Sequence, residues 1–180
     1  MRKVLYISIF ILISLGGVLT YQSFVFEDKK LHVVFCDVGQ GDAIFLKTPG
    51  NLDVLIDGGP DDRVLSCLAS HMPFWDKTIE LVILTHPHAD HLNGLIKVAK
   101  NYKIAAFATE NLKNKTQGFA KLIDLIENQA RIKIQYVYAG DNFKLKDGVN
   151  VEIVGPTKEF LRSTSPGGNI GESGEFASVL

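Results

Sequence analysis

The chain has 180 residues, a formal net charge of −1 and 46% hydrophobic residues. This length fits one domain, and the near-neutral charge excludes the strongly basic surface that would by itself indicate a nucleic-acid-binding protein. Only two cysteines are present, Cys36 and Cys67. We interpret both as small core residues, although an exported protein could pair them.

The N-terminus carries an apolar segment that is long enough to cross a membrane. Arg2 and Lys3 precede an uncharged stretch over residues 4–26, and the next charged residue is Glu27. A signal peptide also begins with basic residues, but the stretch offers only a poor cleavage site. We therefore expect residues 1–26 to be a single-pass anchor in the cell membrane, with the basic end in the cytoplasm and the domain extracytoplasmic. Secretion after cleavage of a signal peptide is the alternative.

The remaining chain, residues 31–180, predicts a layered α/β domain. Three short apolar segments separated by turn residues predict an antiparallel meander over residues 31–36, 43–47 and 52–56. Helices and strands then alternate, with helices expected over residues 62–72, 92–100 and 115–129 and strands over residues 79–84 and 104–108. Strand character returns over residues 132–138, 142–145 and 149–154, with Asp147-Gly148 as a hairpin turn. This order of elements fits half of an αβ/βα sandwich.

A cluster of histidines and one aspartate directly follows the buried strand expected at residues 79–84. Residues 85–91 read Thr-His-Pro-His-Ala-Asp-His, and imidazole with carboxylate is a ligand set that suits zinc and, less selectively, manganese or iron. His86 and His88 lie two apart and can face the same side, where they would bind one ion. Asp90 and His91 begin the next helix and can be aimed at an adjacent ion. If Asp90 only capped that helix, the three clustered histidines would have no explanation.

With these residues the chain resembles the metallo-β-lactamase superfamily, and more narrowly the ComEC-type hydrolase domain of competence DNA-uptake channels. The narrower resemblance rests on residues 35–44 (Phe-Cys-Asp-Val-Gly-Gln-Gly-Asp-Ala-Ile), residues 55–60 (Leu-Ile-Asp-Gly-Gly-Pro) and residues 84–91. It extends from residue 31 to the C-terminus. True β-lactamases share the metal motif but lack the Asp-Val-Gly-Gln-Gly-Asp segment, so a lactam is a less favoured substrate.

The resemblance implies a site with two zinc ions, or with manganese in their place, for which His86, His88, Asp90 and His91 are ligands. It also implies hydrolysis by a metal-activated water that Asp90 orients as well. Asp57 resembles the aspartate that supports the metal loops of the family from behind the ligands; the alternative is an ordinary carboxylate in a turn at the end of a strand.

Asp37, Gln40 and Asp42 resemble the turn that lies beside the site in the family. The alternative is a tight glycine turn whose polar side chains satisfy the backbone. His32 and His71 have no partner at metal-ligand spacing, and we interpret both as structural.

The expected function is that of a membrane-anchored, extracytoplasmic metallohydrolase, a phosphodiesterase or nuclease that acts on DNA. Two alternatives are a hydrolase of small-molecule esters, thioesters or lactams, and a truncated binding module without catalytic activity. Residues 163–175 are rich in serine, glycine and glutamate, and residues 176–180 resemble the start of a strand. In the resembled family a comparable segment opens the second half of the sandwich. The resemblance therefore implies that only the N-terminal half of the sandwich, with an incomplete metal site, is present here.

Overall fold

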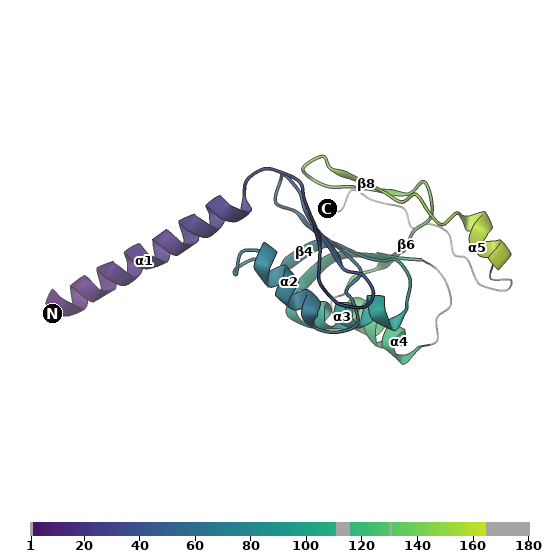
Figure 1. The fold of residues 1–180 in the computed structure, drawn as a ribbon, viewed down its shortest axis with the longest axis horizontal. Coiled ribbons are helices and arrows are strands. Elements are labelled where there is room, and N and C mark those ends of the chain that lie inside the picture. Colours follow the sequence, from purple (N-terminus) through teal and green to yellow (C-terminus); the bar gives the residue numbers. More distant parts are fainter. Residues whose placement is uncertain (1, 111–115, 130, 165–180) are drawn as a thin grey trace.

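A computed structural model describes residues 2–110, 116–129 and 131–164. It begins with the long helix α1 (Arg2–Phe26), which projects away from the rest of the chain (Figure 1). None of its residues is buried, and by length and composition it could cross a membrane. A signal sequence near the N-terminus can have the same length and composition. The apolar segment is therefore confirmed as a helix, whereas its topology stays a prediction.

The domain is built on a six-stranded sheet whose strands follow the order of the chain. The sheet begins with β1 (His32–Phe35), β2 (Ile44–Lys47) and β3 (Asp53–Ile56). The middle strand β2 is antiparallel to both of its neighbours, so the expected meander is confirmed. Three parallel strands extend the sheet from β3 and are β4 (Thr78–Leu84), β5 (Lys103–Thr109) and β6 (Ile134–Tyr136). All strands except β2 run in one direction. Their carboxyl ends consequently meet at a single edge of the sheet.

Helices cover one face of this sheet (Figure 1). They are α2 (Arg63–His71), α3 (Ala89–Asn101) and α4 (Gln117–Asp124), which continues into the π-helical turn η1 (Leu125–Gln129). Leu68 and Leu95 from the helices pack with Phe45 and Phe107 from the strands in one buried cluster. Residue 115, the expected start of the third helix, lies outside the described residues; Thr116 caps α4 through a bond from the Phe119 amide to its side chain.

A small hairpin packs on the opposite face. Its strands β7 (Asn142–Lys144) and β8 (Asn150–Glu152) are antiparallel, and the turn between them confirms the hairpin expected at Asp147-Gly148. Phe143 and Leu145 join Leu81 and Ala106 of the sheet in a second buried cluster. The helix α5 (Lys158–Thr164) follows. The layered α/β architecture is therefore as expected, while residues 176–180 and most of residues 163–175, for which the sequence predicts the start of a second half, lie outside the described residues.

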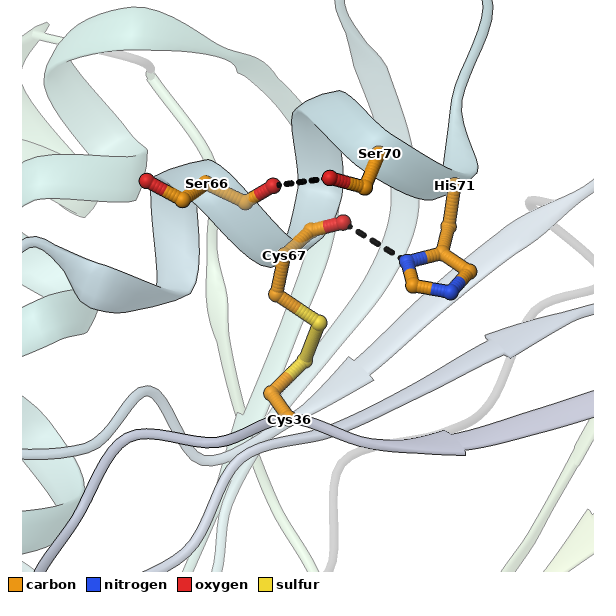
Figure 2. Close-up of a disulfide and its surroundings, with 5 residues drawn as sticks. All are labelled: Cys36, Ser66, Cys67, Ser70 and His71. Carbon is orange, nitrogen blue, oxygen red and sulfur yellow. Dashed lines mark hydrogen bonds between the residues drawn. A yellow bond between two sulfur atoms is a disulfide. The ribbon is translucent and has the colours of Figure 1, made fainter.

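One interpretation was wrong, because Cys36 and Cys67 form a disulfide rather than two separate core thiols. Figure 2 shows the bond between the chain just after β1 and the middle of α2, with the His71 ring turned toward the Cys67 carbonyl oxygen. The Cα atoms are 5.7 Å apart, although 31 positions separate the cysteines in sequence. The packing of α2 on the sheet creates this proximity. No local pattern in the sequence encodes it.

Candidate metal centre

The three motifs of the sequence meet at the carboxyl edge of the sheet, where backbone hydrogen bonds join them. The Gly58 amide donates to the His91 carbonyl at 2.8 Å, and the Gly59 amide donates to the Asp42 carbonyl at 2.8 Å. The Gly94 amide donates in turn to the Gly59 carbonyl at 2.9 Å. These bonds fix the segments that follow β1, β3 and β4 to one another. They also pair polar groups of the backbone at this junction, as a buried backbone requires.

Two glycines allow this close approach. Gly41 has a φ of +75°, and a Cβ at this position would overlap the Asp90 carbonyl oxygen. A Cβ on Gly94 would overlap the Gly58 carbonyl oxygen. Since only glycine lacks this atom, both positions require it for the turn of residues 37–42 and the loop after β3 to pack against α3.

Asp57 is the central polar residue of this junction. It directly follows β3, is 2% exposed and adopts a φ of +59°, a conformation that aspartate tolerates better than most residues. Its Oδ1 accepts a hydrogen bond from the Thr85 amide at 2.8 Å. Its Oδ2 accepts bonds from Thr85 Oγ1 at 2.6 Å and from His91 Nδ1 at 2.9 Å. One carboxylate therefore holds both the end of β4 and the first turn of α3.

This network assigns the protons of two imidazole rings. Because Thr85 Oγ1 gives its proton to Asp57, its oxygen is left to accept from His86 Nδ1, which lies 3.0 Å away. His91 Nδ1 likewise gives its proton to Asp57. In the neutral form of each ring Nε2 then carries a free lone pair, which is the form that binds a metal ion when a carboxylate holds the other nitrogen.

The three histidine rings of the motif lie against one another. The centroid of the His86 ring is 4.6 Å from that of His88 and 4.0 Å from that of His91. Burial lowers the pKa of the His86 imidazole, and the neighbouring imidazoles of His91 and His88 lower it further. The shift favours the neutral imidazole of His86, which is the form that binds a metal ion.

Asp90 lies in the first turn of α3, and the glutamine of the first motif reaches it. Gln40 Nε2 donates to Asp90 Oδ2 at 3.4 Å. The N-cap of α3 is His88, and its side chain makes no capping bond, so Asp90 is not the helix cap that the alternative interpretation assumed. The side chains of Asp37 and Asp42 are exposed, and in the described part of the chain no hydrogen bond links either of them to the histidines. Their roles stay predictions.

Sequence reasoning missed Thr85, which connects Asp57 to His86. The sequence feature that could have identified it is a hydroxyl residue directly before the first histidine.

A cleft of about 560 Å³ opens beside the histidine cluster, between the first turns of α3 and α4. His88, Asp90, Asn93 and Thr116 are among the residues that line it. The cleft therefore adjoins two of the proposed ligands, His88 and Asp90.

The donors fit zinc in kind, since the neutral rings of His86 and His91, with Nδ1 bonded to Thr85 and Asp57, would offer Nε2 beside a carboxylate and a third imidazole. Within residues 2–110, 116–129 and 131–164, however, no group of three or more histidine, cysteine or acidic side chains is positioned to hold an ion. His86, His88, Asp90 and His91 are the residues that would do so. Their role as ligands and that of Asp57 as their support stay predictions.

The model of a protein family described as the beta-lactamase superfamily domain matches residues 53–171, more than half of the chain. The chain belongs to the beta-lactamase superfamily. Its layered fold with a central sheet is the metallo-β-lactamase fold, and members of this superfamily are metallohydrolases that typically bind zinc. The matched region includes Asp57 and the whole histidine cluster.

Several solved structures are similar to this superfamily member. The metallo-β-lactamase SMB-1 in a complex with mercaptoacetic acid is 19% identical with a TM-score of 0.46, over 68% of this chain and 48% of that one. A diphosphatase of the PhnP family is 16% identical with a TM-score of 0.42, over 64% of this chain and 52% of that one. MEM-A1, a subclass B3 metallo-β-lactamase from a soil metagenome library, is 18% identical with a TM-score of 0.40, over 64% and 45%. The chain spans about half the length of these structures.

Proposed function

We propose that this chain belongs to a membrane-anchored, zinc-dependent hydrolase that cleaves phosphodiesters, DNA among them, outside the cytoplasm. The hydrogen-bond network of Asp57 carries the proposal. In this network a buried carboxylate bonds His91 Nδ1 directly and reaches His86 Nδ1 through Thr85 Oγ1, which leaves Nε2 of both neutral rings to a metal ion. A purely structural turn has no need of that arrangement.

The chain's own residues have distinct parts in this chemistry. His86, His88, Asp90 and His91 would hold zinc, which when bound supplies a Lewis acid and lowers the pKa of a water. Asp57 keeps two of the imidazoles in the ligand tautomer, directly for His91 and through a threonine hydroxyl for His86. Gln40 restrains Asp90 from the opposite loop. Asp90 also lies at the N-terminus of α3, where the helix dipole favours a negative charge.

The extracytoplasmic location is supported by the disulfide between Cys36 and Cys67. Disulfides persist in oxidising compartments and are rare in the cytoplasm, where thiols are kept reduced. Arg2 and Lys3 before the apolar helix favour the same orientation, since basic residues flanking a span remain on the cytoplasmic side. An anchor leaves Met1 or Arg2 at the mature N-terminus, whereas a cleaved signal peptide leaves a shortened chain, and intact-mass spectrometry of the membrane fraction distinguishes the two.

A phosphodiester substrate is supported by the resemblance of the Asp-Val-Gly-Gln-Gly-Asp segment, which the structure brings against Asp90 through Gln40. Among the described residues that line the cleft there is no lysine or arginine. The negative charge of a phosphate would therefore be met by bound ions rather than by basic side chains.

Metal binding is tested first, by elemental analysis of the purified protein and of the variant His86→Ala/His88→Ala. We expect zinc or manganese in the protein, and the loss of at least one equivalent in the variant. The control is His32→Ala, because His32 is exposed and bonds Asp28 at the start of β1, the opposite end of that strand from the edge that carries the cluster. An unchanged metal content in the double variant would contradict the ligand assignment.

Substrate class is tested next with the metal-loaded protein. Turnover of bis-p-nitrophenyl phosphate and single-stranded DNA that is lost in Asp90→Ala supports the proposal. Hydrolysis of a chromogenic lactam or a thioester without phosphodiester turnover favours the small-molecule alternative. Binding of DNA with no turnover of any substrate favours a non-catalytic module.

A further inference from the structure

Two large aromatic side chains are exposed in the turn between α2 and β4. Phe74 is 55% exposed and Trp75 is 41% exposed, and their rings stack edge to face with centroids 4.9 Å apart. Trp75 is the only tryptophan of the chain. Exposure of two large aromatic rings to water is unfavourable. Their presence side by side in an ordered turn therefore indicates that they contact another apolar surface.

The turn that carries the pair is held firmly. Pro73 is buried, and its carbonyl accepts a hydrogen bond from the Asp76 amide at 2.9 Å. Asp76 Oδ1 accepts a bond from the Thr78 amide at 3.1 Å. The fixed backbone therefore presents the two rings to the surroundings. It does not fold them into the core.

The same turn touches the end of the apolar helix. The Phe74 amide donates to Gln22 Oε1 at 3.1 Å, and Figure 1 shows α1 and α2 on the same side of the domain. About 20 residues of α-helix span the roughly 30 Å hydrocarbon core of a bilayer. If α1 begins its crossing near Arg2, Gln22 lies at the boundary of that core. The aromatic turn then lies at the level of the lipid headgroups.

The histidine cluster lies at the opposite end of β4 from the aromatic turn. β4 begins at Thr78, just after the aromatic turn, and ends at Leu84, just before the histidine cluster. Seven residues of strand extend about 20 Å. The aromatic turn and the histidines are thus held on opposite edges of the sheet.

We propose that Phe74 and Trp75 insert into the interfacial region of the lipid bilayer beside α1 and dock the domain on the membrane. The histidine cluster, about 20 Å along β4 from the aromatic turn, is then held away from the docked edge of the domain and faces water-borne substrates rather than lipids. Tryptophan is enriched at this depth because its ring is apolar and its N–H finds a polar partner. Asp76 and Lys77 follow the pair and offset each other in charge, so the aromatic rings dominate recognition. The inference rests on the proposed anchoring by α1.

The native tryptophan provides the test. The full chain is reconstituted in phosphatidylcholine vesicles whose acyl chains are brominated near the headgroup, and tryptophan fluorescence is measured. We expect the bromolipid to quench most of the Trp75 emission and aqueous acrylamide to quench little of it. The matched control is Phe35→Trp in a Trp75→Phe background, because Phe35 is 77% exposed at the far end of β1. Its tryptophan should show the reverse pattern.

The other outcomes distinguish failure of the anchoring by α1 from failure of the docking by Phe74 and Trp75. If alkaline carbonate releases the chain from the vesicles, the anchoring by α1 fails, and the docking fails with it. If the chain is integral but Trp75 is quenched by acrylamide and not by bromolipid, the anchoring stands and the docking is overturned. Protection of Trp75 from both quenchers also overturns it, because protein, such as a second copy of the chain, then covers the pair.

Discussion

Replacement of Asp57 by asparagine tests the network on which the metal centre depends. The substitution keeps the shape of the side chain and tolerates the φ of +59°, so it adds no backbone strain. The remaining Oδ1 can still accept from the Thr85 amide, but the new amide group faces the Thr85 hydroxyl and His91 Nδ1, which both donate to Oδ2 in the native protein. Two charge-assisted hydrogen bonds in a buried site are lost.

Each such bond contributes about 1.5–3 kcal/mol, and reorientation of the threonine hydroxyl recovers a part of the loss. We therefore expect the free energy of unfolding to fall by about 3 kcal/mol. The asparagine amide also donates to the Thr85 hydroxyl oxygen, so the hydroxyl proton turns toward His86 Nδ1. This nitrogen must then accept, and the proton of the His86 ring moves to Nε2. His91 changes in the same way. Because both nitrogens would be lost as ligands, zinc affinity should fall by roughly 10- to 100-fold.

Urea unfolding followed by Trp75 fluorescence gives the stability, and competition with a chromophoric chelator gives the zinc affinity. The control is Asp62→Asn, which removes the same charge from an exposed aspartate whose side chain makes no capping bond; neither quantity should change. Lower stability with native zinc affinity would show that Asp57 is structural only. If both stayed at the native values, the assigned network itself would be refuted.

Three further substitutions test other features of the fold. Cys36→Ser/Cys67→Ser opens a covalent loop with a sequence separation of 31, so the unfolding free energy should fall by about 3–4 kcal/mol, and a reductant should then have no further effect on urea unfolding. Lys47→Met removes the partner of Asp53, 2.8 Å away with both side chains at most 5% exposed, and should cost about 3–5 kcal/mol at pH 8. Burial raises the pKa of Asp53 from 3.8 to about 7 although Lys47 lowers it, so loss of Lys47 should raise the pKa of Asp53 further. The folded variant then binds a proton that the unfolded chain lacks, and its stability should rise as pH falls through that higher pKa; a loss independent of pH would contradict this account. Gly94→Ala places a Cβ on a carbonyl oxygen of the loop after β3 and should cost about 3 kcal/mol in thermal unfolding, and a native melting temperature would show that the loop yields easily.

Local patterns in the sequence were sufficient for the elements and for the motif. The uncharged run before Glu27 determines a helix, and the period-two segments and glycine turns determine the meander of β1, β2 and β3. The order of apolar strand, histidine cluster and helix was also readable, because β4, the motif and α3 are consecutive in the chain and their residues interact with near neighbours.

Tertiary structure alone decided which distant residues meet. The disulfide, the bond between Gln40 and Asp90 and the bonds of Asp57 to Thr85 and His91 join positions 28–50 residues apart. These contacts depend on the parallel register of β3 with β4 and on helices packed over one face, which bring the ends of separate strands to one edge. A hydrogen bond needs its two atoms placed to within a few tenths of an ångström. Residue types and spacing along the chain carry no such information. The sequence therefore identified the histidines, and only the fold showed that a buried carboxylate bonds His91 directly and reaches His86 through Thr85.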